Sequence, residues 1–208
     1  MRILITAGPT REAIDELRFI SNRSSGKMGY ALARKGRQMG CEVTLVSGPV
    51  SLEPPKGVDV VLVESADEMI EQTLKILGNG FDAIISCAAI ADYKPVKREG
   101  KIRSGQDLTL ELSPTRKLVR EAKKMFPELF ICAFKAEYGI SEMELVRTAR
   151  QWMKASGSGM VIANDVSEPI FGSDETKVII VTPDGTEHAE GSKKIVASII
   201  FDRLQNFL

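Results

Sequence analysis

The stretch Arg18-Phe-Ile-Ser-Asn-Arg-Ser-Ser-Gly-Lys-Met-Gly29 separates an apolar run from an amphipathic segment. The run before it predicts a strand over residues 2–6, and the pattern after it predicts a helix from Tyr30 to about Met39. The stretch is therefore expected to connect a first strand to a first helix. In a parallel α/β sheet such a connection lies at the carboxyl ends of the strands, where ligands bind.

The end of this stretch has the residues of a phosphate site. Ser24, Ser25 and Gly26 stand where free backbone N–H groups gather at the start of a helix, and these groups favour an anion. Lys27 in the first helical turn is unfavourable beside the helix dipole unless an anion binds there. The sequence therefore predicts a bound phosphate. Asn22 and Arg18 flank the site, although in isolation turn chemistry for Asn22 and a solvated charge for Arg18 are the better explanations.

Strand and helix patterns alternate along the chain after this point. Further strands are expected at 42–47, 58–63, 81–87, 129–134 and 160–163, and a hairpin over 177–188. Helices are expected from Ser65 to about Leu77, from Pro114 to about Met125, from Ser141 to about Ser156 and from Ser192 to about Asn206. The alternation predicts an α/β fold with a mostly parallel sheet. No linker divides residues 1–208, so a single domain is expected.

One section departs from the alternation. Residues 97–107 are polar, basic and contain glycine, and Leu108–Leu112 alternates like a half-exposed strand. Residues 94–113 are therefore predicted to form a protruding arm or flap, which could pair with a partner chain by strand addition. Five cations between Lys94 and Arg103 could close on phosphates, although a charge run is also common in a solvated loop.

Asp92 follows small residues at the predicted end of a buried strand. Ala88 and Ala89 would let a flat ring or a phosphate approach the backbone closely. Asp92 could then accept hydrogen bonds from a base or ribose, or hold Mg²⁺. A cap or turn aspartate is the equally good alternative.

Composition excludes several classes of function. The 208 residues carry no net charge and have a pI of about 6.6, whereas nucleic-acid binders are usually basic. The sequence has no apolar run of membrane-spanning length, and its first residues are interpreted as a strand, not a signal peptide. Three cysteines indicate a reducing compartment. The single histidine argues against a histidine metal site or a Ser–His–Asp mechanism.

Two common nucleotide motifs are missing. Met28 stands where a P-loop needs Ser or Thr, and Ser21 stands where it needs Gly. The first strand is not followed by G-x-G-x-x-G, and the second ends in Val46-Ser47-Gly48 without the acid that binds an adenosine ribose. An NAD(P)-dependent reductase is therefore a weak alternative, and a non-catalytic nucleotide-binding module is another.

The motifs that carry a family resemblance are Thr6–Glu12, Arg18–Gly29, Ala88–Pro95, Lys101–Arg103 and Ala163–Ser167. In this order and spacing, over the whole chain, they resemble phosphopantothenate–cysteine ligase. The resemblance implies a Rossmann-like, cytoplasmic homodimer. It implies that CTP, or ATP, activates 4′-phosphopantothenate as an acyl-nucleotidylate with Mg²⁺, and that L-cysteine then attacks. In many relatives a phosphopantothenoylcysteine decarboxylase is fused to this domain, so a separate decarboxylase is a possible partner.

The resemblance also assigns residues. Asn22 matches the asparagine that handles the acyl-nucleotidylate, Lys101 matches a flap lysine needed for the first half-reaction, and Arg18 lies where the family keeps a basic residue. Substrate contacts are expected at Asn22, Arg18 and Ala89, and metal binding at Asp92. The expected nucleotide-binding residues are Gly8, Ser24, Ser25, Gly26, Lys27, Ser86, Cys87, Ala88, Asp92, Lys101, Pro114, Thr115, Arg116, Lys117, Phe134 and Lys154.

Two segments differ from the bacterial pattern. This chain has Ala133-Phe-Lys-Ala-Glu-Tyr138 where bacterial forms have Gly-Phe-Ala-Ala-Glu-Thr. Two nucleotide-binding lysines of the bacterial forms fall at Trp152 and Ser156 here. Lys154 is the nearest cation and Lys135 is a further candidate, so the choice between CTP and ATP stays open at this point.

Overall fold

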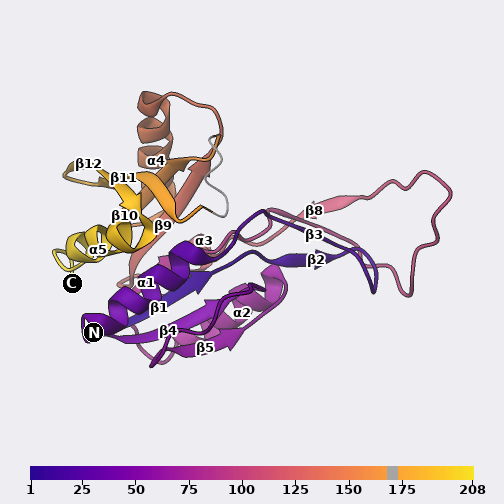
Figure 1. Cartoon of the computed structure of the whole chain (residues 1–208), viewed down its shortest axis with the longest axis horizontal. Helices are drawn as coiled ribbons and strands as arrows, with labels where there is room; N and C mark the ends of the chain where they lie inside the picture. The colour runs from indigo at the N-terminus through magenta and orange to yellow at the C-terminus, as the bar shows by residue number, and fades with distance from the viewer. Residues whose placement is uncertain (168–172) are drawn as a thin grey trace.

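The computed structural model describes residues 1–167 and 173–208, which form an eight-stranded sheet flanked by helices (Figure 1). The strands lie in the order β12-β11-β10-β9-β6-β1-β4-β5. The six parallel strands are β1 (Arg2–Ala7), β4 (Glu42–Ser47), β5 (Asp59–Leu62), β6 (Ala83–Ser86), β9 (Phe130–Glu137) and β10 (Met160–Asp165). The antiparallel hairpin of β11 (Glu175–Thr182) and β12 (Gly185–Ser192) extends one edge. The mostly parallel α/β prediction is confirmed.

Helices cover both faces of this sheet. The helices α1 (Lys27–Gln38) and α5 (Lys193–Leu204) pack together on one face. The helices α2 (Ala66–Leu77), α3 (Leu118–Met125) and α4 (Glu142–Ser156) cover the other face.

The first strand shows why both faces need a cover. Side chains alternate across a strand, so Ile3 and Ile5 join the core under α1 and α5, and Leu4 joins the core under α2 and α3. All three are fully buried, and each contributes about 1.5–3 kcal/mol of transfer free energy.

The strand order reverses next to β1. The chain passes from β1 to β4 on one side and later returns to β6 on the other side. At their carboxyl ends the two segments that leave β1 and β6 meet, because Ala89 N donates to the carbonyl of Gly8 at 2.9 Å. Such a switch point is where open α/β sheets bind ligands.

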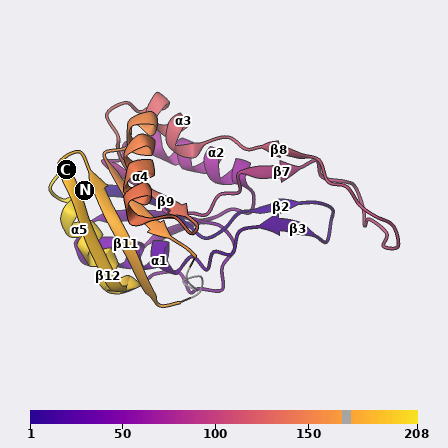
Figure 2. The same cartoon turned by 90° about the horizontal axis from the view of Figure 1, so that it is seen from above.

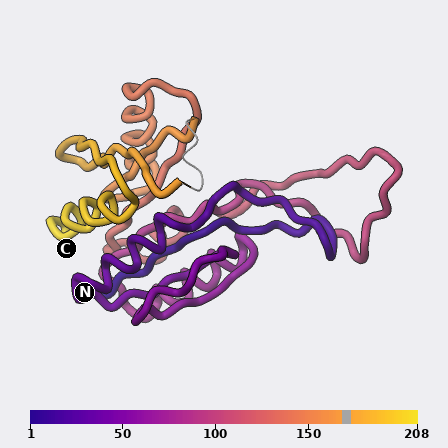
Figure 3. Tube along the Cα trace, viewed as in Figure 1, coloured from indigo at the N-terminus to yellow at the C-terminus, as the bar shows by residue number. Residues whose placement is uncertain are grey.

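Two short hairpins project from the body on the side away from both chain termini (Figures 1, 2 and 3). One pairs β2 (Arg11–Ala13) with β3 (Phe19–Ser21), and the other pairs β7 (Tyr93–Pro95) with β8 (Leu112–Pro114). We call them, with their connecting residues 14–18 and 96–111, the arm. The predicted arm over 94–113 is therefore present, whereas the β2–β3 hairpin was expected to be a loop.

Two sequence predictions near the arm are wrong. Only Leu112 of the expected strand Leu108–Leu112 is in a strand, because β7 ends at Pro95 and pairs with residues 112–114 alone. The helix expected from Pro114 begins at Leu118. Thr115 instead lies in the short segment between β8 and α3, where its N–H donates to the carbonyl of Asp92 at 2.9 Å.

Candidate functional site

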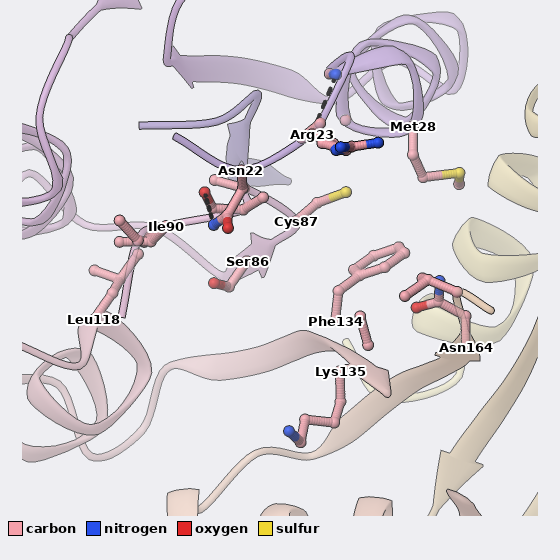
Figure 4. Close-up of a pocket in the computed structure, with 18 of the residues that line it drawn as sticks. Asn22, Arg23, Met28, Ser86, Cys87, Ile90, Leu118, Phe134, Lys135 and Asn164 are labelled. Carbon is pink, nitrogen blue, oxygen red and sulfur yellow. Dashed lines mark hydrogen bonds between the residues drawn. The ribbon is translucent and has the colours of Figure 1, made fainter. Parts of the chain in front are cut away.

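A pocket of about 630 Å³ lies at the carboxyl ends of β1, β6, β9 and β10 (Figure 4). Its walls come from segments that are far apart in the sequence. The lining consists of residues 22–29, 86–92, 115–119 and 134–136, with Trp152, Asn164, Val166, Thr176, Val178 and Lys193.

The predicted phosphate site, residues 24–27, forms one wall, and we call these residues the phosphate loop. Gly26 precedes α1 with φ +74°, and a Cβ there would lie 2.7 Å from Val50 Cγ1, so both the backbone angle and the space require glycine. Gly29 allows α1 to approach β1, because a Cβ would lie 2.5 Å from that of Ala7. No side chain among the described residues caps this helix. Its first N–H groups therefore have the arrangement that binds anions.

Asn22 connects the phosphate loop to the segment after β6. Its Nδ2 donates to the carbonyl of Ala89 at 3.0 Å. The N–H of Ala88 donates to Thr6 Oγ1 at 3.2 Å, which fixes the same segment to β1. Asn22 lies on the same side of the pocket as Ser86 and Cys87 (Figure 4). An amide at this position could orient a polar ligand between the two segments.

The segment before α3 forms another wall. Thr115 is buried, and its Oγ1 donates to the carbonyl of Ala91 at 2.6 Å. Lys117 forms an ion pair with Asp92, so the two predicted nucleotide-binding residues contact each other. Arg116 pairs with Glu121, which raises the pKa of the arginine further above its usual value.

The wall from β9 and α4 carries Phe134, Lys135 and Trp152. Lys135 Nζ lies 2.8 Å from Glu137 Oε1. Lys154 is absent from the lining found among the described residues, so Lys135 supplies the cation of this wall. Trp152 is half-buried, and in the described part of the chain its Nε1 has no hydrogen-bond partner.

Arg18 and Lys101 lie on the arm, and neither is among the described residues that line the pocket. Arg18 donates to Asp15 Oδ2 at 3.1 Å through Nε and to the carbonyl of Ile102 at 2.6 Å through Nη2. The Asp15 side chain is fully buried and also accepts the N–H of Ile102 at 3.0 Å. The hydrogen bond from Arg18, helped by backbone donors and opposed by desolvation, holds the pKa of Asp15 well below its usual value. The carboxylate of Asp15 therefore links Arg18 to Ile102, the residue that follows Lys101.

Three other predicted residues have structural surroundings that explain them. Gly8 packs closely against Gly26, because a Cβ added at Gly26 would lie 3.3 Å from the Cα of Gly8, and Pro114 belongs to β8. Neither Gly8 nor Pro114 is among the described pocket-lining residues. Cys87 lines the pocket, but burial raises the pKa of its thiol to about 12, so it is not a thiolate nucleophile at neutral pH.

Lys193 and Asn164 line the pocket but were not assigned to the site from the sequence. Lys193 stands in the first turn of α5, with no acidic residue in that turn, which is the pattern that singled out Lys27. Asn164 is near the carboxyl end of β10. Both positions could have been identified by these signals.

The described residues contain no group of three or more metal-ligating side chains of the His, Cys, Asp and Glu types. None of the helices that the structure describes has the length and apolar character needed to cross a membrane.

Comparison with known proteins identifies the class of this α/β domain. The chain belongs to the family described as DNA/pantothenate metabolism flavoprotein C-terminal domain, whose model matches residues 1–208. The coenzyme A biosynthesis bifunctional protein CoaBC of Thermococcus kodakarensis is 39% identical over 211 residues, covering 100% of this chain and 51% of the relative. The protein of the same name from Methanocaldococcus jannaschii is 38% identical over 207 residues, with 100% and 51% covered. The chain thus spans about half the length of the curated relatives it matches.

Solved structures of related domains have the same fold as this chain. The crystal structure of the C-terminal domain of CoaBC is 35% identical with a TM-score of 0.80, covering 99% of this chain and 94% of that chain. A Cab2 mutant in complex with phosphopantothenate-cysteine also has a TM-score of 0.80, covering 99% of this chain and 85% of that one. At 18% identity this second likeness concerns the fold alone.

Proposed function

We propose that this chain is a ligase that joins 4′-phosphopantothenate to L-cysteine, with CTP as the activating nucleotide. The observation that carries the proposal is the Asn22 amide, which links the phosphate loop to Ala89 at the switch point of the sheet. The relatives are named for coenzyme A biosynthesis, and that pathway supplies the substrate class. A cytoplasmic location accompanies this role.

The proposed chemistry converts a poor electrophile into a good one. A carboxylate oxygen of 4′-phosphopantothenate attacks the α-phosphorus of the nucleotide, and the bond to pyrophosphate breaks. The cysteine amine then attacks the carbonyl carbon, the bond to the nucleoside monophosphate breaks, and the amine loses a proton. Residues 24–27 would bind the phosphates, and Asn22 would orient the acyl group between the two segments.

The remaining walls suggest where the nucleotide lies. Thr115, Arg116 and Lys117 with Phe134 would surround the base and ribose. Mg²⁺ usually takes most of its ligands from phosphates and water and needs only one or two carboxylates. Asp92 is the one carboxylate among the described residues that line the pocket, which fits that requirement, and it would exchange its contact with Lys117 for one with the ion.

A second copy of the chain is the proposed partner of the arm. Exposed apolar side chains gather on the arm, namely Leu17, Phe19, Tyr93, Val96, Leu108 and Leu112. Apolar side chains grouped on an exposed surface mark interaction sites. A homodimer would cover them and bring Arg18 and Lys101 against another protomer. A phosphopantothenoylcysteine decarboxylase, fused or separate, is the proposed partner for the next step.

Pyrophosphate release from the purified chain tests the proposal. Reactions contain Mg²⁺ and 4′-phosphopantothenate, with CTP or ATP, with and without cysteine. Release that requires 4′-phosphopantothenate and favours CTP, with formation of the cysteine adduct, is expected. Release that favours ATP would support the proposed ligase activity but with ATP as the activating nucleotide. No release from folded protein would favour the non-catalytic module.

A further inference from the structure

Two helices that are far apart in the sequence, α1 and α5, bring two lysines to one corner of the pocket. Lys27 begins α1 and Lys193 begins α5, and both line the pocket. Both side chains contact one short segment, because Lys27 Nζ lies 2.8 Å from Asp174 Oδ1 and Lys193 Nζ donates to the carbonyls of the flanking Ser173 and Glu175, so the two ammonium groups are neighbours. Burial lowers the pKa of Lys193, and the charge of Lys27 lowers it further. Two such cations repel each other unless an anion lies with them.

An internal carboxylate supplies that anion in the structure. Lys27 Nζ lies 2.8 Å from Asp174 Oδ1, and this contact lowers the pKa of Asp174. The Asp174 side chain is 84% exposed, so water competes for its carboxylate and the pair is weak. A ligand with more negative charge could therefore replace Asp174 at Lys27.

Lys193 is held in place but retains binding capacity. Its Nζ donates to the carbonyls of Ser173 and, at 3.3 Å, Glu175. An ammonium group has three N–H donors, and the contacts within the described part of the chain use two of them, which leaves one for a ligand in the pocket that Lys193 lines. The backbone contacts pre-position the cation and reduce the entropy that binding would cost.

We propose that Lys27 and Lys193 together form a polyphosphate-binding site, and that Asp174 occupies it as a counter-ion until the phosphates of the nucleotide displace it. This inference rests on the proposed function, because it assigns the triphosphate of that reaction to a particular corner of the pocket. It adds Lys193 as a binding residue and Asp174 as a competing group.

Inorganic tripolyphosphate is the probe, and its affinity for the full chain is measured by calorimetry at fixed Mg²⁺. Lys193→Gln should weaken binding about tenfold, because one charge-assisted hydrogen bond is lost. Lys194→Gln removes the same charge from the next, exposed position and should change affinity less than about twofold. Asp174→Asn should tighten binding about threefold, and Asp184→Asn, at an exposed aspartate in the turn between β11 and β12, is its matched control.

Equal effects of Lys193→Gln and Lys194→Gln, or weaker binding by Asp174→Asn, would overturn the inference. If Lys193→Gln unfolds at a lower temperature than the wild type, Lys193→Arg replaces it, since the arginine keeps the charge and should retain most of the affinity. The readout separates the two proposals. Ligase activity with unchanged tripolyphosphate affinities would reject this site alone, whereas the expected affinities without pyrophosphate release would reject the ligase alone.

Discussion

The walls of the pocket stand on the carboxyl ends of buried strands, whereas Arg18 and Lys101 stand on an arm held together by polar contacts. In the pocket, Ser86 and Ala89 belong to or follow a strand that lies fully within the sheet. In the arm, the carboxylate of Asp15 joins the two hairpins through Arg18 and the N–H of Ile102.

The difference separates the site into two parts. Asn22 is exposed, but its Nδ2 donates to the carbonyl of Ala89, which follows a buried strand, so this contact ties its side chain to the body of the fold. The position of Lys101 depends on contacts within the arm and on the proposed second copy of the chain, which would cover the exposed apolar side chains of the arm. We therefore expect substitutions in the pocket to change the rate of the reaction directly. Substitutions in the arm should change it by altering how Lys101 reaches a pocket.

The largest effect is expected from Asn22→Asp. The amide donor to the carbonyl of Ala89 is lost, so the side chain should no longer orient the acyl group for attack by the cysteine amine. Formation of the cysteine adduct should fall about 100-fold or more, while pyrophosphate release persists. Quantifying both products by mass spectrometry checks this. Asn206→Asp, far from the pocket near the C-terminus, is the control, and an unchanged overall rate in Asn22→Asp would remove Asn22 from the mechanism.

A smaller effect is expected from Lys101→Gln. If the arm lysine neutralises phosphate charge in the first half-reaction, pyrophosphate release should slow about tenfold or more. Lys97→Gln is the matched control, because Lys97 is an arm cation already paired with Glu16 at 2.8 Å. Equal rates for the two variants would show that the arm contributes no specific charge.

Gly26→Ala should destabilise the phosphate loop. The alanine would keep an unfavourable positive φ and meet Val50, at a cost of about 1–3 kcal/mol of unfolding free energy. Gly100→Ala in the arm is the control, since Gly100 has a similar φ of +68° with no atom within 4 Å of the added Cβ. Urea unfolding should show the larger loss for Gly26→Ala, and equal losses would mean that the loop has no close packing.

The smallest expected effect is a change in the slope of stability against pH on the acid side. The folded-state pKa of Asp15 is lowered, so its contribution to stability is complete above the unfolded pKa of about 4 and is lost as pH falls toward the folded value. Asp15→Asn should therefore flatten the fall in stability below about pH 5, and urea unfolding across about pH 3–7 measures the slope. Asp107→Asn, an exposed arm aspartate, should leave the slope unchanged.

Apolar periodicity was enough to predict most of the sheet, because runs such as Phe81–Cys87 have few alternatives to a buried strand. The β2–β3 hairpin was missed because its support is distant in sequence, as in the contact of Arg98 N with the carbonyl of Ile14 at 2.9 Å. Lys193 has a local signal, a lysine in the first turn of a helix, but its place beside Lys27 follows from the packing of α5 against α1, which local sequence does not reveal. The place of residues 24–27 at the start of a helix was predictable because they contain their own turn and helix signals, and phosphate binding there stays a prediction.

An isotope experiment tests the central claim that the chain activates a carboxylate as an acyl-nucleotidylate. The carboxylate of 4′-phosphopantothenate is labelled with ¹⁸O, and the chain converts it with CTP, Mg²⁺ and cysteine. Attack of the amine on the carbonyl carbon leaves one labelled oxygen with the departing nucleotide. We predict one ¹⁸O in the CMP product by mass spectrometry, and label in phosphate or in neither product would contradict the proposed route.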